Sequence, residues 1–129
     1  MEPLYAFFIS SPGIFFYMAQ EQPKDVRTFV LKHEIYGFFK SKKSTSFENR
    51  LKSAILQELS VELSGKDYKV LQGNKVLDPK TGNFIINYDI VVQGKKAMTA
   101  SAHGKAAIVN RNGKPYIKSQ KVYVSLFYF

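Results

Sequence analysis

The sequence predicts an α+β fold, in which a mainly helical N-terminal half precedes an antiparallel β-meander. Three observations predict it. Residues 46–63 repeat apolar side chains at helical spacing, residues 84–92 alternate apolar and polar side chains, and turn-forming clusters divide the rest into about three long strands plus short edge strands. Helices followed by strands, without regular alternation, are typical of the α+β class. The length of 129 residues predicts a single domain over 1–129.

The first element, residues 4–19, is apolar and rich in aromatic side chains. One interpretation is a helix that begins at Pro12, with Ser11 as its N-cap. The other is a hairpin of Tyr5–Ile9 and Ile14–Met18 around a Pro-Gly turn. We slightly favour the helix, and both remain open.

Neither interpretation predicts a membrane anchor. The apolar run is shorter than the roughly 20 residues that a spanning helix needs, and Ser10–Gly13 interrupts it. No Lys or Arg comes before the run, as a signal peptide would require. We therefore expect no complete transmembrane helix and no signal peptide, which leaves the localisation unknown, with the cytoplasm as the default expectation.

For residues 25–40 the pattern favours a second helix. Asp25 is a suitable N-cap, and Val26, Phe29 and Val30 follow near-helical spacing. The β-branched and aromatic residues of this stretch also suit strands, so that alternative stays open.

The clearest helix is 46–63. Thr45 and Glu48 fit a capping box, in which the Thr hydroxyl binds the third helical amide and Glu48 reaches back. One face of the helix is apolar, and Gly65 provides a left-handed C-cap. The residues of that face are Phe47, Leu51, Ala54, Ile55, Leu59 and Leu63.

From residue 65 onward the pattern predicts strands. A short strand at 68–71 and a turn at 78–83 precede the alternating strand 84–92. Further strands at 97–109 and 116–129 flank a hairpin loop at 110–113. A helix wrapped by such a meander resembles the cystatin-like and NTF2-like architectures in outline, and no function follows from that outline.

Two of these strands carry unusual side chains. One face of 97–109 carries only small residues: Ala100, Ala102, Gly104 and Ala106. This predicts that a helix packs closely against the strand or, alternatively, that these residues form the floor of a groove. The end of 116–129 is apolar on both faces, so something must cover both. A two-residue turn at Asn112-Gly113 would place the small row beside Tyr123, whereas the hydrophobic pattern prefers Val122. A bulge near Pro115 would reconcile the two.

The charge is concentrated in the second half of the chain. The net charge is +9, of which residues 1–64 contribute +1 and residues 65–129 contribute +8. Such asymmetry indicates a polyanionic partner, DNA or RNA, although solvated lysines at the rim of a sheet are the simpler explanation. Aromatic and basic side chains on one sheet suit single-strand binding. The candidate nucleic-acid-binding residues are Lys95, Lys96, Lys105, Arg111, Lys114, Lys118, Lys121 and Tyr123.

The leading hypothesis is therefore a non-enzymatic binding or assembly module whose β half contacts nucleic acid backbone. The alternative is a structural subunit of a larger protein assembly, such as a virion, a secretion apparatus or an envelope complex. Its partners would be other protein subunits or further copies of this chain. Its candidate interface residues are Phe7, Phe8, Phe15, Phe16, Phe127 and Phe129.

We expect no catalytic residues, no metal site and no cofactor. There is no cysteine, and the two histidines show no ligand spacing. A His103–Asp89 pair as general base is a third, weaker hypothesis.

Overall fold

The computed structural model describes residues 22–40 and 43–129. Of these residues, 57% lie in strands and 16% in helices. The predicted helical N-terminal half is wrong, because β1 (Asp25–Leu31) and β2 (Ile35–Phe38) come before α1 (Ser46–Glu58). The fold is mostly β and contains two sheets. The predictions for residues 4–19, and with them Phe7, Phe8, Phe15 and Phe16, lie outside the described residues.

The stretch at residues 25–31 forms a strand because its side chains also alternate with a period of two. Phe29 and Leu31 face the core, whereas Val26 and Thr28 point outward. All seven residues pair with the strand at 122–128. Local spacing fitted a helix as well, but β-branched side chains suit a pleated surface, and the paired strand lies far away in the sequence.

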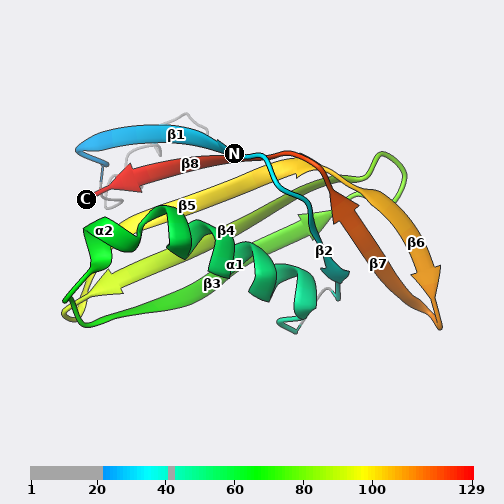
Figure 1. Cartoon of the computed structure of the whole chain (residues 1–129), viewed down its shortest axis with the longest axis horizontal. Helices are drawn as coiled ribbons and strands as arrows, with labels where there is room; N and C mark the ends of the chain where they lie inside the picture. The colour runs from blue at the N-terminus through cyan, green and yellow to red at the C-terminus, as the bar shows by residue number, and fades with distance from the viewer. Residues whose placement is uncertain (1–21, 41–42) are drawn as a thin grey trace, which may run out of the picture.

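The remaining strands complete two antiparallel sheets (Figure 1). A five-stranded sheet has the order β1-β8-β5-β4-β3, and a three-stranded sheet has the order β2-β7-β6. Antiparallel pairing is thus confirmed. The bounds are β3 Tyr68–Leu77, β4 Asn83–Val92, β5 Lys95–Lys105, β6 Ala107–Arg111, β7 Lys114–Ser119 and β8 Val122–Tyr128. The strand expected at 68–71 is therefore ten residues long, and both strands expected at 97–109 and 116–129 are divided.

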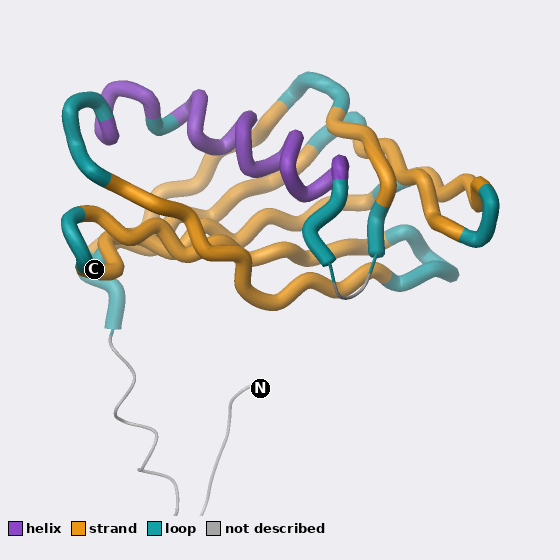
Figure 2. Tube along the Cα trace, turned by 90° about the horizontal axis from the view of Figure 1, so that it is seen from below, coloured by secondary structure: helices purple, strands orange, loops and turns teal. Residues whose placement is uncertain are grey.

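The helical layer lies on one face of the five-stranded sheet (Figure 2). The helix predicted at 46–63 is present as α1 and a short α2 (Ser60–Leu63), with Leu59 between them. Its predicted apolar face is buried in the core. Ala100 and Ala102 lie fully buried on the face of the sheet that carries the helix, beside the large Tyr88 and Ile86.

The predicted capping box forms only in part. Thr45 is the N-cap, but its side chain makes no hydrogen bond to a helical amide. Its hydroxyl instead contacts the backbone carbonyl of Phe38 and the carboxylate of Glu48. The N-cap side chain therefore ties α1 to the end of β2 and to a buried acid.

That acid, Glu48, is completely buried and forms an ion pair with Lys75. Lys75 reaches it because β3 contains a bulge between Gln72 and Lys75, which changes the register against β4. The hydroxyl of Tyr88 donates a 2.8 Å hydrogen bond to the backbone carbonyl of Glu48. Burial, with the Glu48 carboxylate nearby, raises the pKa of that hydroxyl.

The two sheets meet where both long strands are interrupted. β5 ends at Lys105 and β6 begins at Ala107, while β7 ends at Ser119 and β8 begins at Val122. The break between β5 and β6 contains one residue, whereas the break between β7 and β8 contains two. The pairing register between the two long strands therefore changes by one residue. Arg111 pairs with Lys114, as a two-residue turn requires, and Gly104 still pairs with Val122, as the hydrophobic pattern prefers. The irregularity expected near Pro115 lies instead at residues 106 and 120–121.

The described elements leave the other face of the five-stranded sheet uncovered (Figure 2). Five side chains of this open face are well exposed: Val26, Leu71, Val76, Ile85 and Tyr123. Polar side chains, including Thr99 and Ser101, lie between them.

Candidate nucleic-acid interface

The register change gathers four of the predicted residues around one cavity. Lys105, Lys118, Lys121 and Tyr123 line a space of about 400 Å³ together with Glu34, Ala107 and Gln120. Each lysine belongs to a different segment: the end of β5, β7, and the link between β7 and β8. We call this space the hinge pocket, because it lies where one sheet gives way to the other.

Ser119 holds the backbone at the hinge pocket. Its buried hydroxyl lies 3.0 Å from the carbonyl oxygen of Lys105 and 3.3 Å from that of Lys121, and it can donate to either. Gly82 supports the same place, because its carbonyl accepts a 2.9 Å hydrogen bond from the amide of Ala106. The backbone beside Lys105 is thus held by both Ser119 and Gly82, whereas the backbone at Lys121 is held by the Ser119 hydroxyl.

An aromatic surface adjoins the lysines. The rings of His103 and Tyr123 stack with centroids 5.5 Å apart and planes inclined by 22°. The two residues are cross-strand partners on the open face. Because Tyr123 keeps 44% of its surface exposed, it still has ring area on which a base can stack.

The basic surface continues along the small sheet. Arg111 lies over the ring of Tyr116, with its guanidinium carbon 4.2 Å from the ring centroid. Arg111 and Lys114 are paired at the end of the β6–β7 hairpin, beyond Lys118. We call the five cations from the hinge pocket to this end the basic strip: Lys105, Lys121, Lys118, Arg111 and Lys114. Tyr116 was not predicted as part of it, although its place among the lysines of β7 was a visible signal.

Lys95 and Lys96 lie elsewhere. They begin β5, whereas Lys105 ends it, so the two groups are roughly 30 Å apart along the strand. Lys96 instead lies over the ring of Phe129, 4.8 Å from the centroid. The structure therefore brings six of the eight predicted residues into one region and leaves these two outside it.

Acidic side chains are sparse at the hinge pocket. Glu34 is the acid among its lining residues, and it accepts a 2.9 Å hydrogen bond from the side-chain amide of Gln120. Apart from Glu34 and Gln120, the lining consists of three lysines, Tyr123 and Ala107. The pocket therefore has the composition of an anion site with one carboxylate at its rim.

The predicted interface residues Phe127 and Phe129 are both partly buried. Phe127 lies on the open face, where it pairs with Val26 and Thr99. The amide of Phe129 donates a 3.0 Å hydrogen bond to Ala97. Phe127 and Phe129 are thus both held against β5, near the end of that strand that carries Lys96.

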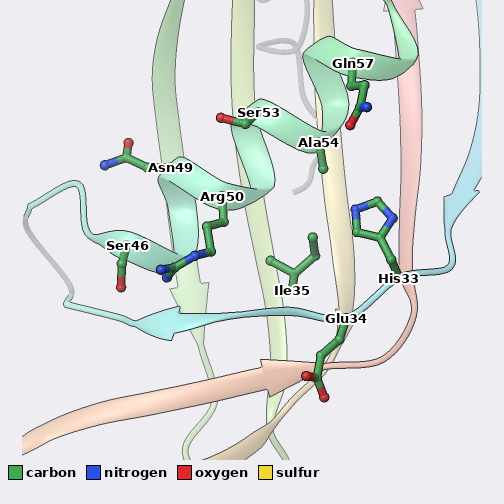
Figure 3. Close-up of a pocket in the computed structure, with 9 residues that line it drawn as sticks. All are labelled: His33, Glu34, Ile35, Ser46, Asn49, Arg50, Ser53, Ala54 and Gln57. Carbon is green, nitrogen blue, oxygen red and sulfur yellow. The ribbon is translucent and has the colours of Figure 1, made fainter.

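The structure does not bring together His103 and Asp89, the pair considered as a general base. Asp89 pairs with Thr99 and accepts its hydroxyl at 2.7 Å, whereas His103 lies four residues further along β5, roughly 13 Å away. A polar pocket of about 510 Å³ beside α1 contains His33 (Figure 3). There Glu34 and Arg50 point away from the imidazole. No cluster of three or more potential metal ligands occurs within residues 22–40 and 43–129.

No helix in the described part of the chain is long and apolar enough to cross a membrane. Compared with protein-family models, curated protein sequences and solved structures, the chain shows no match. The outline likeness to cystatin-like and NTF2-like architectures therefore has no support.

Proposed function

We propose that this protein is a nucleic-acid-binding module that holds a single strand along the basic strip. The observation that carries the proposal is the convergence of Lys105, Lys118 and Lys121 on the hinge pocket, beside the exposed ring of Tyr123. Phosphate groups would contact the lysines, and a base would stack on Tyr123. Binding of this kind has little sequence preference, because no side chain is required to read base edges.

The salt dependence of binding gives a quantitative expectation. For a single strand, the slope of log K against log salt is about −0.7 for each phosphate neutralised. Three contacts at the hinge pocket predict a slope of about −2, and all five cations of the basic strip predict about −3.5. Fluorescence anisotropy of a labelled mixed-sequence oligonucleotide, titrated at several salt concentrations, measures this slope.

A matched pair of variants distinguishes the effect of the hinge-pocket lysines from the effect of net charge. Lys105→Glu/Lys118→Glu/Lys121→Glu should abolish binding. Lys66→Glu/Lys69→Glu/Lys80→Glu changes the net charge by the same amount, at exposed lysines outside the basic strip. This variant should keep most of the nucleic-acid binding affinity. Tyr123→Ala should weaken binding roughly tenfold through lost stacking. Equal losses in the two triple variants, or no binding at low salt, would refute the proposal.

A second candidate function follows from the open face. Val76 and Ile85 are exposed cross-strand partners on this face, and the exposed Leu71 lies on the same strand as Val76. Exposed apolar side chains that lie together are typical of protein–protein contacts, so the β3–β4 part of the open face suits a contact with another subunit of a protein assembly. Light scattering coupled to size exclusion, at low and high salt, tests it. A defined oligomer that Ile85→Ser dissociates would support assembly. A monomer at all concentrations would exclude self-assembly through this face.

A further inference from the structure

A second cavity, larger than the hinge pocket and more apolar in its lining, lies elsewhere in the described part of the chain. It has a volume of about 640 Å³, within the range of small-molecule sites. Its walls come from the end of β3, the turn after it, the β6–β7 hairpin, and three described residues that follow β2: Phe39, Lys40 and Lys43. The lining residues are Phe39, Lys40, Lys43, Lys75, Val76, Leu77, Pro79, Ile108, Gly113, Lys114 and Pro115. We call it the lysine-rimmed pocket.

The interior of this pocket is apolar. Phe39 is 4% exposed, and Leu77 and Ile108 are partly buried against the core. Lys75 lies beside Phe39, its ammonium 5.0 Å from the ring centroid, but its charge is already paired with Glu48. The deep part of the pocket therefore presents hydrocarbon and a neutralised ion pair, which together favour an apolar ligand tail.

The mouth of the pocket is cationic. Lys40, Lys43 and Lys114 are exposed, and none of the described lining residues is acidic. An apolar cavity with several lysines at its mouth complements a ligand that has a hydrocarbon chain and one anionic head. A neutral ligand of the same shape would gain nothing from those charges.

We propose that the lysine-rimmed pocket binds a single-chain amphiphile with an anionic head group, such as a long-chain carboxylate. The chain lies against Phe39, Leu77 and Ile108, and the head group contacts Lys40 and Lys43. This site is separate from the hinge pocket, on which the proposed nucleic-acid binding is centred. The two proposals share one boundary residue, Lys114, which is therefore left unchanged in the test.

Laurate below its micelle concentration is the probe, and dodecanol is the neutral control. Amide chemical shifts of the ¹⁵N-labelled full chain should move saturably around Phe39, Leu77 and Ile108. Lys40→Glu/Lys43→Glu should weaken laurate binding roughly tenfold or more, the loss of a charge-assisted contact, and should leave dodecanol unaffected. Both side chains are exposed, so the variant should fold, and the amide spectrum without ligand verifies this.

Two further variants make the test specific. Lys66→Glu changes one exposed lysine next to β3 at the end opposite the pocket, and Lys105→Glu/Lys118→Glu/Lys121→Glu removes the hinge pocket. Both should bind laurate as the unchanged protein does. The proposal is overturned if shifts occur elsewhere, if binding does not saturate, or if dodecanol binds as tightly as laurate.

Discussion

The buried ion pair between Glu48 and Lys75 allows a sharp prediction about stability. Both side chains are nearly inaccessible to water, at 0% and 4% exposure. Replacing Lys75 with Met keeps the volume of the side chain but leaves the Glu48 carboxylate buried without its cation. Breaking a buried pair in this way costs about 3–5 kcal/mol. A domain of this size has a free energy of unfolding of about 5–15 kcal/mol, so the variant should lose a large part of it.

Urea denaturation followed by circular dichroism measures the effect. With a slope of about 2 kcal/mol per molar urea, a loss of 4 kcal/mol moves the midpoint down by roughly 2 M. Lys69→Met is the matched control: it lies on the same strand with its side chain exposed, and it should change stability by about 0.5 kcal/mol or less.

A double-mutant cycle tests the reasoning itself. Glu48→Gln/Lys75→Met contains no unpaired charge, so it should be more stable than Lys75→Met alone, with a coupling energy of a few kcal/mol. The explanation fails if Lys75→Met costs less than about 1 kcal/mol, or if the two substitutions are simply additive.

Three other predictions concern single side chains. Because burial raises the pKa of Tyr88, the folded state retains the phenol proton at pH values where the unfolded state loses it. The contribution of Tyr88 to stability should therefore be constant below about pH 10 and fall above it by up to about 1.4 kcal/mol per pH unit. Tyr88→Phe should make alkaline urea midpoints less dependent on pH, and an unchanged slope would contradict the assignment. Gly82→Ala should destabilise by more than about 1 kcal/mol, because φ is +81° and a Cβ would overlap the Ala106 carbonyl oxygen; Gly94→Ala, at the same φ in open space, is the control in thermal melts and should lose less. Ser119→Ala should cost about 1 kcal/mol and increase amide exchange at residues 105–107 and 121, whereas unaltered exchange there would show that the hydroxyl does not hold the hinge.

The sequence predicted those elements whose pattern is local. The helix at 46–63 and the strand at 84–92 are confirmed, because each carries one unambiguous period of apolar residues. The strand at 25–31 was missed because its side chains fit both periods. The information that decides between them is the pairing with β8, which no local window contains.

The candidate site was predictable in composition but not in geometry. Lys105, Lys118 and Lys121 appear on two long strands in the sequence, and only the one-residue register change turns them toward a common pocket. Lys95 and Lys96 seemed equivalent by charge, yet they occupy the other end of β5. The ion pair of Lys75 with Glu48 could not be predicted, because nothing in the sequence shows that a bulge directs Lys75 toward the core.

The pairing of β1 with β8 also constrains the order of folding during synthesis. Asp25 faces Tyr128, so the two strands are about a hundred residues apart, and closing such a loop is entropically slow. While the ribosome is still making the residues between them, β1 has no partner, although the helix and the β3–β4 hairpin can already form. During this interval an unpaired, partly apolar strand is prone to incorrect pairing and aggregation. In the newly made chain, β1 therefore stays without its strand partner from its own emergence until that of β8.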